Sequence, residues 1–125
     1  MNVHMDAREK RVAEMQRLLA SDRRGTWVWA HAGGASPGLV RRLLRAHPNL
    51  YADLAGRSFD VMSDGEWKVL LEKFSDRFIL GTDAPNLQQF TLIIGRWRKL
   101  LKDLGPVAAS RLAHQNAERL LNLRH

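Results

Sequence analysis

The stretch that decides the fold is residues 77–85, which read RFILGTDAP. An apolar run ends there in a glycine, a hydroxyl and a carboxylate, and a proline follows two residues after the carboxylate. A short apolar run bounded by turn residues is typical of a buried parallel strand. Because α/β folds place their chemistry where parallel strands end, Asp83 is a candidate functional residue. We expect the rest of the chain to bring His4 and His31 to the same rim of the sheet.

The composition indicates one globular domain over residues 1–125. Of the 125 residues, 45% are hydrophobic and none is a cysteine. This hydrophobic content fits a packed core rather than a disordered chain. Without cysteine there is no disulfide framework and no thiolate metal site, in agreement with a cytoplasmic location. No apolar run approaches the roughly 20 residues that cross a bilayer, and the first residues lack a signal-peptide pattern, so we expect neither a membrane protein nor a secreted one.

The net charge of +7 raises the possibility of a nucleic-acid partner. The arginines, however, are spread over three separate amphipathic segments near residues 8–24, 41–45 and 96–99. They alternate there with apolar positions, and no segment concentrates them with interleaved aromatic residues. This pattern indicates solvated helix faces, so a nucleic-acid partner is not expected.

Strand and helix patterns alternate along the chain. The apolar spacing predicts helices near residues 6–20, 37–46, 66–74, 90–101 and 112–121, and strands at 26–30, 50–54 and 78–82, with a short first strand before His4. A polar loop is expected from residue 55 to residue 63. Such alternation implies parallel strands joined by right-handed helical crossovers. Four strands make a small open sheet or half of a TIM barrel, because a complete barrel takes about 250 residues.

Three chemically capable side chains follow predicted strands: His4, His31 and Asp83. Two imidazoles and a carboxylate are a plausible ligand set for zinc or another divalent metal ion. A water bound to such an ion would have a lowered pKa and could serve as a nucleophile. Asp83 could instead act as a general base. The pair Gly33-Gly34 would let a substrate approach closely beside His31.

Each of these residues also has a purely structural interpretation. A histidine after a strand is often hydrogen-bonded in a structural role, and Asp83 could cap the helix that follows it. Asp53 follows a strand too and could belong to either class. Residues 116–119, Asn-Ala-Glu-Arg, are expected on a helix surface.

Four pieces of the sequence resemble the amidohydrolase-related family of metal-dependent (β/α)8-barrel hydrolases, in the branch that includes decarboxylases. They read VHMD at 3–6, VWAHAGG at 28–34, HPNLYADL at 47–54 and DRFILGTDAP at 76–85. In this order they are similar to the ends of the family's fifth to eighth strands. The NAERLL run at 116–121 is similar to its C-terminal helix. The resemblance implies an α/β fold, the parallel (βα)4 half of a TIM barrel made of strands five to eight, with an extra C-terminal helix.

The resemblance also implies roles for the three residues. His4 would be a metal ligand, His31 a metal ligand or a catalytic residue, and Asp83 a metal ligand or the base. The cofactor would be a divalent metal ion, with zinc as the first choice. The substrate would be a small molecule, and the reaction hydrolysis or decarboxylation.

One departure from the family limits this inference. The family's first strand carries an H-x-H pair that holds the metal ion, whereas no H-x-H occurs in this sequence. We therefore expect the C-terminal half of a metal-dependent hydrolase that acts through a metal-activated water. Its partner would be a missing N-terminal half or a second copy. The alternative is a non-catalytic, truncated half-barrel that self-associates or pairs with a partner subunit.

Overall fold

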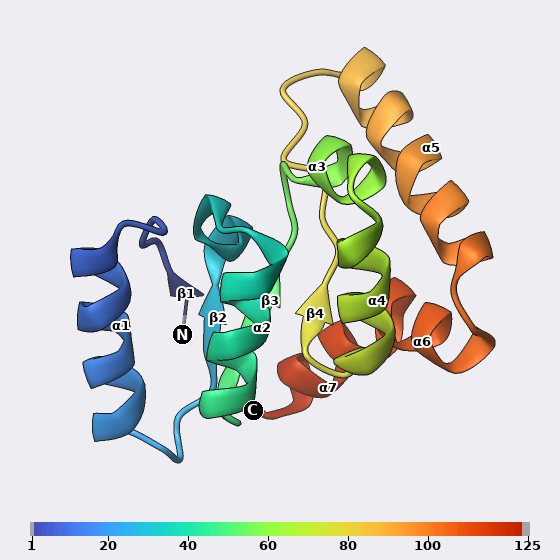
Figure 1. Cartoon of the computed structure of the whole chain (residues 1–125). Helices are drawn as coiled ribbons and strands as arrows, with labels where there is room; N and C mark the ends of the chain where they lie inside the picture. Colours follow the sequence, from blue (N-terminus) through green and yellow to red (C-terminus); the bar gives the residue numbers. More distant parts are fainter. Residues whose placement is uncertain (1, 124–125) are drawn as a thin grey trace.

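Four short parallel strands form one sheet in the order β1-β2-β3-β4 (Figure 1). The structure is a computed structural model that describes residues 2–123, so the two ends of the expected domain, residues 1 and 124–125, lie outside it. The strands are β1 (Asn2–Val3), β2 (Trp27–Trp29), β3 (Leu50–Asp53) and β4 (Phe78–Ile79). Every neighbouring pair is parallel. The expected parallel α/β fold is confirmed, and its four strands are consistent with part of a TIM-barrel-like fold.

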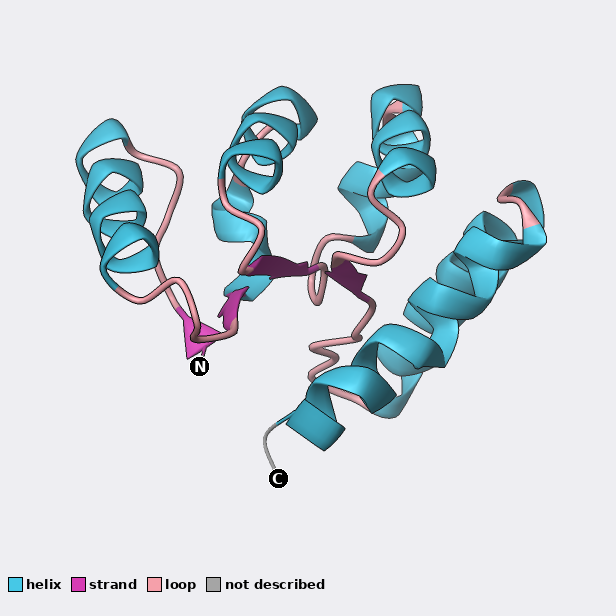
Figure 2. Ribbon diagram, turned by 90° about the horizontal axis from the view of Figure 1, so that it is seen from below, coloured by secondary structure: helices cyan, strands magenta, loops and turns pink. Residues whose placement is uncertain are grey.

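Helices follow each strand, and α1, α2 and α4 lie outside the arc that the strands form (Figure 2). They are α1 (Glu9–Ser21), α2 (Pro37–Ala46), α3 (Ser58–Ser63), α4 (Gly65–Lys73), α5 (Leu87–Asp103), α6 (Pro106–Ser110) and α7 (Asn116–Leu123), with a 3₁₀ segment η1 (Ala30–Gly34) and a π segment η2 (Arg111–Gln115). Within residues 2–123, none of these helices combines the length and the apolar character needed to span a membrane.

The two faces of the sheet differ because side chains alternate along each strand. Val3, Trp29, Ala52 and Phe78 stand side by side across the four strands, are at most 5% exposed and belong to the core beneath the outer helices. The alternate positions include Val28 and Ile79, which line a shallow groove on the other face together with Leu120 and Leu121 of α7. The C-terminal helix therefore lies against the inner side of the arc.

The loop expected at residues 55–63 is in part a helix, α3. The prediction of a loop was wrong because a helix of 6 residues is too short to show a helical stripe in the sequence. Two of its residues, Ser58 and Val61, are nevertheless buried, and the side chains of Arg57 and Asp60 pair across its first turn at 2.7 Å. Tertiary packing therefore stabilises a turn that local propensity does not specify.

Asn116 was expected on a helix surface and is instead fully buried. Its Nδ2 donates hydrogen bonds to the backbone carbonyls of Ser75, at 2.6 Å, and Phe78, at 2.7 Å, on either side of the start of β4. The π segment η2 directly precedes it and adds a residue to one turn. This shifts the faces of the following helix, so regular helical spacing does not indicate where Asn116 points.

We predict that Asn116→Ala lowers the free energy of unfolding by about 2 kcal/mol, since it leaves two carbonyls at a buried strand without their donor. Urea denaturation of the variant against the parent chain measures the change. Asn122→Ala is the matched control, because Asn122 lies on the same helix with an exposed side chain. Equal effects of the two substitutions would contradict the buried role of Asn116.

Candidate functional site

The three candidate residues lie beyond the carboxyl ends of their strands, at one rim of the sheet. His4 directly follows β1, His31 follows β2 within η1, and Asp83 lies beyond β4. The imidazole rings of His4 and His31 have their centroids 6.3 Å apart. Asp83 and His31 flank Gly56, because a Cβ placed on that glycine would lie 3.4 Å from Asp83 Oδ2 and 3.6 Å from His31 Nδ1. The fold therefore brings all three residues into one neighbourhood.

This neighbourhood is not a complete metal site. In the part of the chain that the structure describes, no three histidine, aspartate or glutamate side chains lie close enough together to hold a metal ion. The donor types are those that zinc takes, but a tetrahedral site needs three or four donors at about 2 Å from one point. His4, His31 and Asp83 could therefore supply part of the ligand set of a metal ion, and they do not form a complete set in this structure.

The His31 ring is held by one hydrogen bond to the backbone. Its Nδ1 lies 2.6 Å from the carbonyl oxygen of Ala55. A carbonyl oxygen can only accept, so Nδ1 carries the proton, and the Nε2 of the neutral ring keeps a free lone pair. The half-buried ring is thus prepared to accept a proton or to coordinate an ion through Nε2.

Both His31 and Asp83 have a left-handed backbone conformation. The φ angles are 56° at His31, 47° at Ala32 and 49° at Asp83. For a residue with a Cβ this conformation costs about 1–2 kcal/mol. Strain of this kind is found preferentially at functional sites. Two of the three candidate residues therefore have a left-handed backbone, which is uncommon for residues other than glycine.

Asp83 is not a helix cap. Helix α5 begins at Leu87, and its cap is Asn86, whose side chain accepts a hydrogen bond from Gln89 N at 2.9 Å. The Asp83 side chain is exposed, and it has no hydrogen bond or ion pair to any residue among 2–123. The structural interpretation of Asp83 was therefore wrong, and its carboxylate is available to a ligand or a proton.

Asp53 has a structural role. It is the last residue of β3, and its Oδ1 accepts a hydrogen bond from Ala55 N at 2.8 Å. The same Ala55 presents its carbonyl to His31. Asp53 therefore orders the turn that supports the histidine ring.

Two indole N–H groups hold the backbone beside the candidate residues. Trp29 Nε1 donates to the carbonyl of Met5, next to His4, at 2.6 Å. Trp97 Nε1 donates to the carbonyl of Gly81, two residues before Asp83, at 2.7 Å. Both tryptophans are at most 4% exposed. Buried core side chains therefore fix the backbone next to His4 and just before Asp83.

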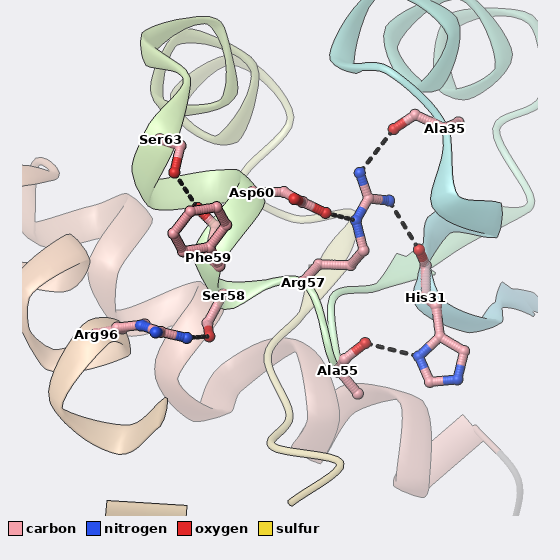
Figure 3. A network of polar contacts seen from close by, with 9 residues as sticks. All are labelled: His31, Ala35, Ala55, Arg57, Ser58, Phe59, Asp60, Ser63 and Arg96. Carbon is pink, nitrogen blue, oxygen red and sulfur yellow. Dashed lines mark hydrogen bonds and ion pairs between the residues drawn. The ribbon is translucent and has the colours of Figure 1, made fainter. Parts of the chain in front are cut away.

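Arg57 belongs to this site and was missed by the sequence analysis. It is only 9% exposed and lies beside the His31 loop, between β3 and α3 (Figure 3). An isolated arginine in a polar segment has the same sequence signature as a solvated surface residue, and its burial depends on residues far away in the chain.

The family model described as amidohydrolase matches residues 1–123 of the chain. A search of the curated proteins finds no match.

We predict that Gly33→Ala destabilises the site loop strongly, because the new Cβ would lie 2.2 Å from the Trp29 ring at a position with a φ of 61°. Gly34→Ala is the matched control, since it has a similar φ of 70° but no atom within 4 Å of the added Cβ. Thermal unfolding should show a loss of about 1–2 kcal/mol for the control, the left-handed cost alone, and a clearly larger loss for Gly33→Ala. Equal losses would mean that the tryptophan does not confine the loop.

Proposed function

The chain belongs to the amidohydrolase family, whose model spans residues 1–123, and we propose that it supplies His31 and Asp83 to a hydrolytic centre that acts on a small molecule. The observation that carries this proposal is the position of the two side chains on either side of Gly56, each on a left-handed backbone. A base and a polarising group at one strand rim are the parts that a hydrolytic reaction needs.

The free carboxylate of Asp83 is suited to take the proton of the attacking water. The Nε2 of His31 is suited to the substrate oxygen, because its protonated form donates a hydrogen bond that polarises the bond under attack. The hydrogen bond from Nδ1 to Ala55 keeps the ring oriented in either protonation state.

Members of the family typically use divalent metal ions. As the alternative to the roles above, His4, His31 Nε2 and Asp83 would form one side of the ligand set of such an ion, zinc being the first choice for these donors. In that case Nε2 would bind the ion and would not donate to the substrate oxygen. The remaining ligands come from outside residues 2–123. When bound, the ion would supply an activated water molecule.

The source of those ligands follows from the shape of the sheet. Strands β1 and β4 are its two edges, and within residues 2–123 no strand pairs with their outer sides. Open edges favour pairing with a further strand. We propose that β1 to β4 correspond to strands five to eight of a barrel and that a second copy or an N-terminal half completes it.

The competing function is a half-barrel that assembles without catalysis. The incomplete metal site favours it. The two proposals differ in whether the loss of His31 or Asp83 changes turnover, and this can be measured directly.

We predict that Asp83→Asn and His31→Ala each lower kcat by about 100-fold or more, as removal of a general acid or base does. The assay measures turnover of a panel of small amides, esters and aromatic acids with zinc present. Asp103→Asn and His114→Ala are matched controls, because both side chains are exposed and lie away from the rim, at the end of α5 and in η2. Retained turnover in Asp83→Asn or His31→Ala would remove that residue from the mechanism.

A second prediction concerns assembly. If a second copy completes the barrel, sedimentation equilibrium of the purified chain gives about twice the 14.3 kDa of one chain, because a closed barrel of this type needs eight strands. A mass of 14.3 kDa at every concentration tested would contradict pairing between copies. The N-terminal half would then be the remaining candidate partner.

A further inference from the structure

Arg57 donates hydrogen bonds to both ends of the loop that carries His31 (Figure 3). Its Nη1 donates to the carbonyl oxygen of His31 at 2.9 Å, and its Nη2 donates to the carbonyl oxygen of Ala35 at 2.8 Å. Between these carbonyls lie the left-handed residues of the loop. One guanidinium thus bridges the start and the end of the strained turn.

The orientation of the guanidinium is itself determined by other contacts. Its Nε donates to the Asp60 carboxylate at 2.7 Å, and its central carbon lies 5.2 Å from the centroid of the Trp67 ring. A planar guanidinium can reach two carbonyls and a carboxylate at once, whereas an ammonium group is a single point charge. Lysine at this position would therefore keep the charge and lose the bridge.

The residues just before Arg57 hold the His31 ring. The carbonyl of Ala55 accepts the hydrogen bond from Nδ1, and Gly56 turns the chain between the two residues with a φ of 76°. The segment 55–57 therefore holds His31 twice, at its ring through Ala55 and at its backbone through Arg57. Movement of the loop would lengthen the hydrogen bond between His31 Nδ1 and the Ala55 carbonyl oxygen. This hydrogen bond determines the tautomer of the ring.

From this geometry we infer that Arg57 is a positioning residue, which keeps His31 in the tautomer with the proton on Nδ1 and leaves Nε2 free at the rim. Arg57 acts through His31 and is not placed to touch the substrate. The effect on turnover rests on the proposed function, whereas the effect on the tautomer does not.

The test is the ¹⁵N spectrum of the His31 ring in the full chain, at a pH where the ring is neutral and without metal or substrate. Arg57→Lys is compared with Arg77→Lys. Arg77 is a matched control, because it also donates to three backbone carbonyls, those of Leu44, His47 and Leu50, but at the other end of the strands. We expect Arg57→Lys to raise the fraction of His31 protonated on Nε2 several-fold and Arg77→Lys to leave it unchanged. Where turnover is measured, kcat should fall about 10–100-fold in Arg57→Lys, as for loss of a partner that orients a functional histidine.

Three outcomes would overturn the inference: an unchanged His31 tautomer in Arg57→Lys, an equal change in both variants, or loss of the near-ultraviolet circular dichroism of the folded chain in Arg57→Lys. The last outcome would make Arg57 a requirement of the whole fold. If the tautomer changes as expected while His31→Ala keeps full turnover, the positioning role stands and the hydrolytic role of His31 falls.

Discussion

The contact of Trp29 with the turn that follows it is the constraint on which the candidate site depends. The indole is fully buried in the core, its N–H holds the backbone beside His4, and its ring leaves no room for a Cβ at Gly33. Glycine at position 33 therefore allows the chain beyond β2 to turn close to this ring, and the left-handed turn carries His31. The Trp29 side chain thus contacts the segments that follow two strands, β1 and β2.

The strain in this turn is balanced by contacts that converge on it from other elements. Charged hydrogen bonds such as those from Arg57 are about twice as strong as neutral ones, and they reach both ends of the loop. Trp97 has the corresponding role at β4, where it holds Gly81 just ahead of Asp83. The positions of the two proposed catalytic groups consequently depend on the packing of α4 and α5 as well as on the strands.

The same architecture explains why the chain offers part of a site rather than a whole one. Parallel strands place their carboxyl ends at one rim, so four strands can present functional groups over only one sector of it. His4, His31 and Asp83 occupy that sector without meeting at a point. Among residues 2–123, no strand pairs with the outer sides of β1 and β4, and in our proposal further strands and further ligands join there.

The sequence by itself determined the alternation of strands and helices, their parallel order and the three residues at the rim, because hydrophobic periodicity and residue chemistry are local properties. It did not indicate the burial of Asn116, the helix α3 or the place of Arg57. Each of these depends on partners distant in the chain: Asn116 bonds carbonyls at β4, and Arg57 bonds carbonyls beyond β2. Only the tertiary structure decides such contacts. A polar side chain can be buried when folding brings it a hydrogen-bonding partner, and here the partner lies far away in the sequence.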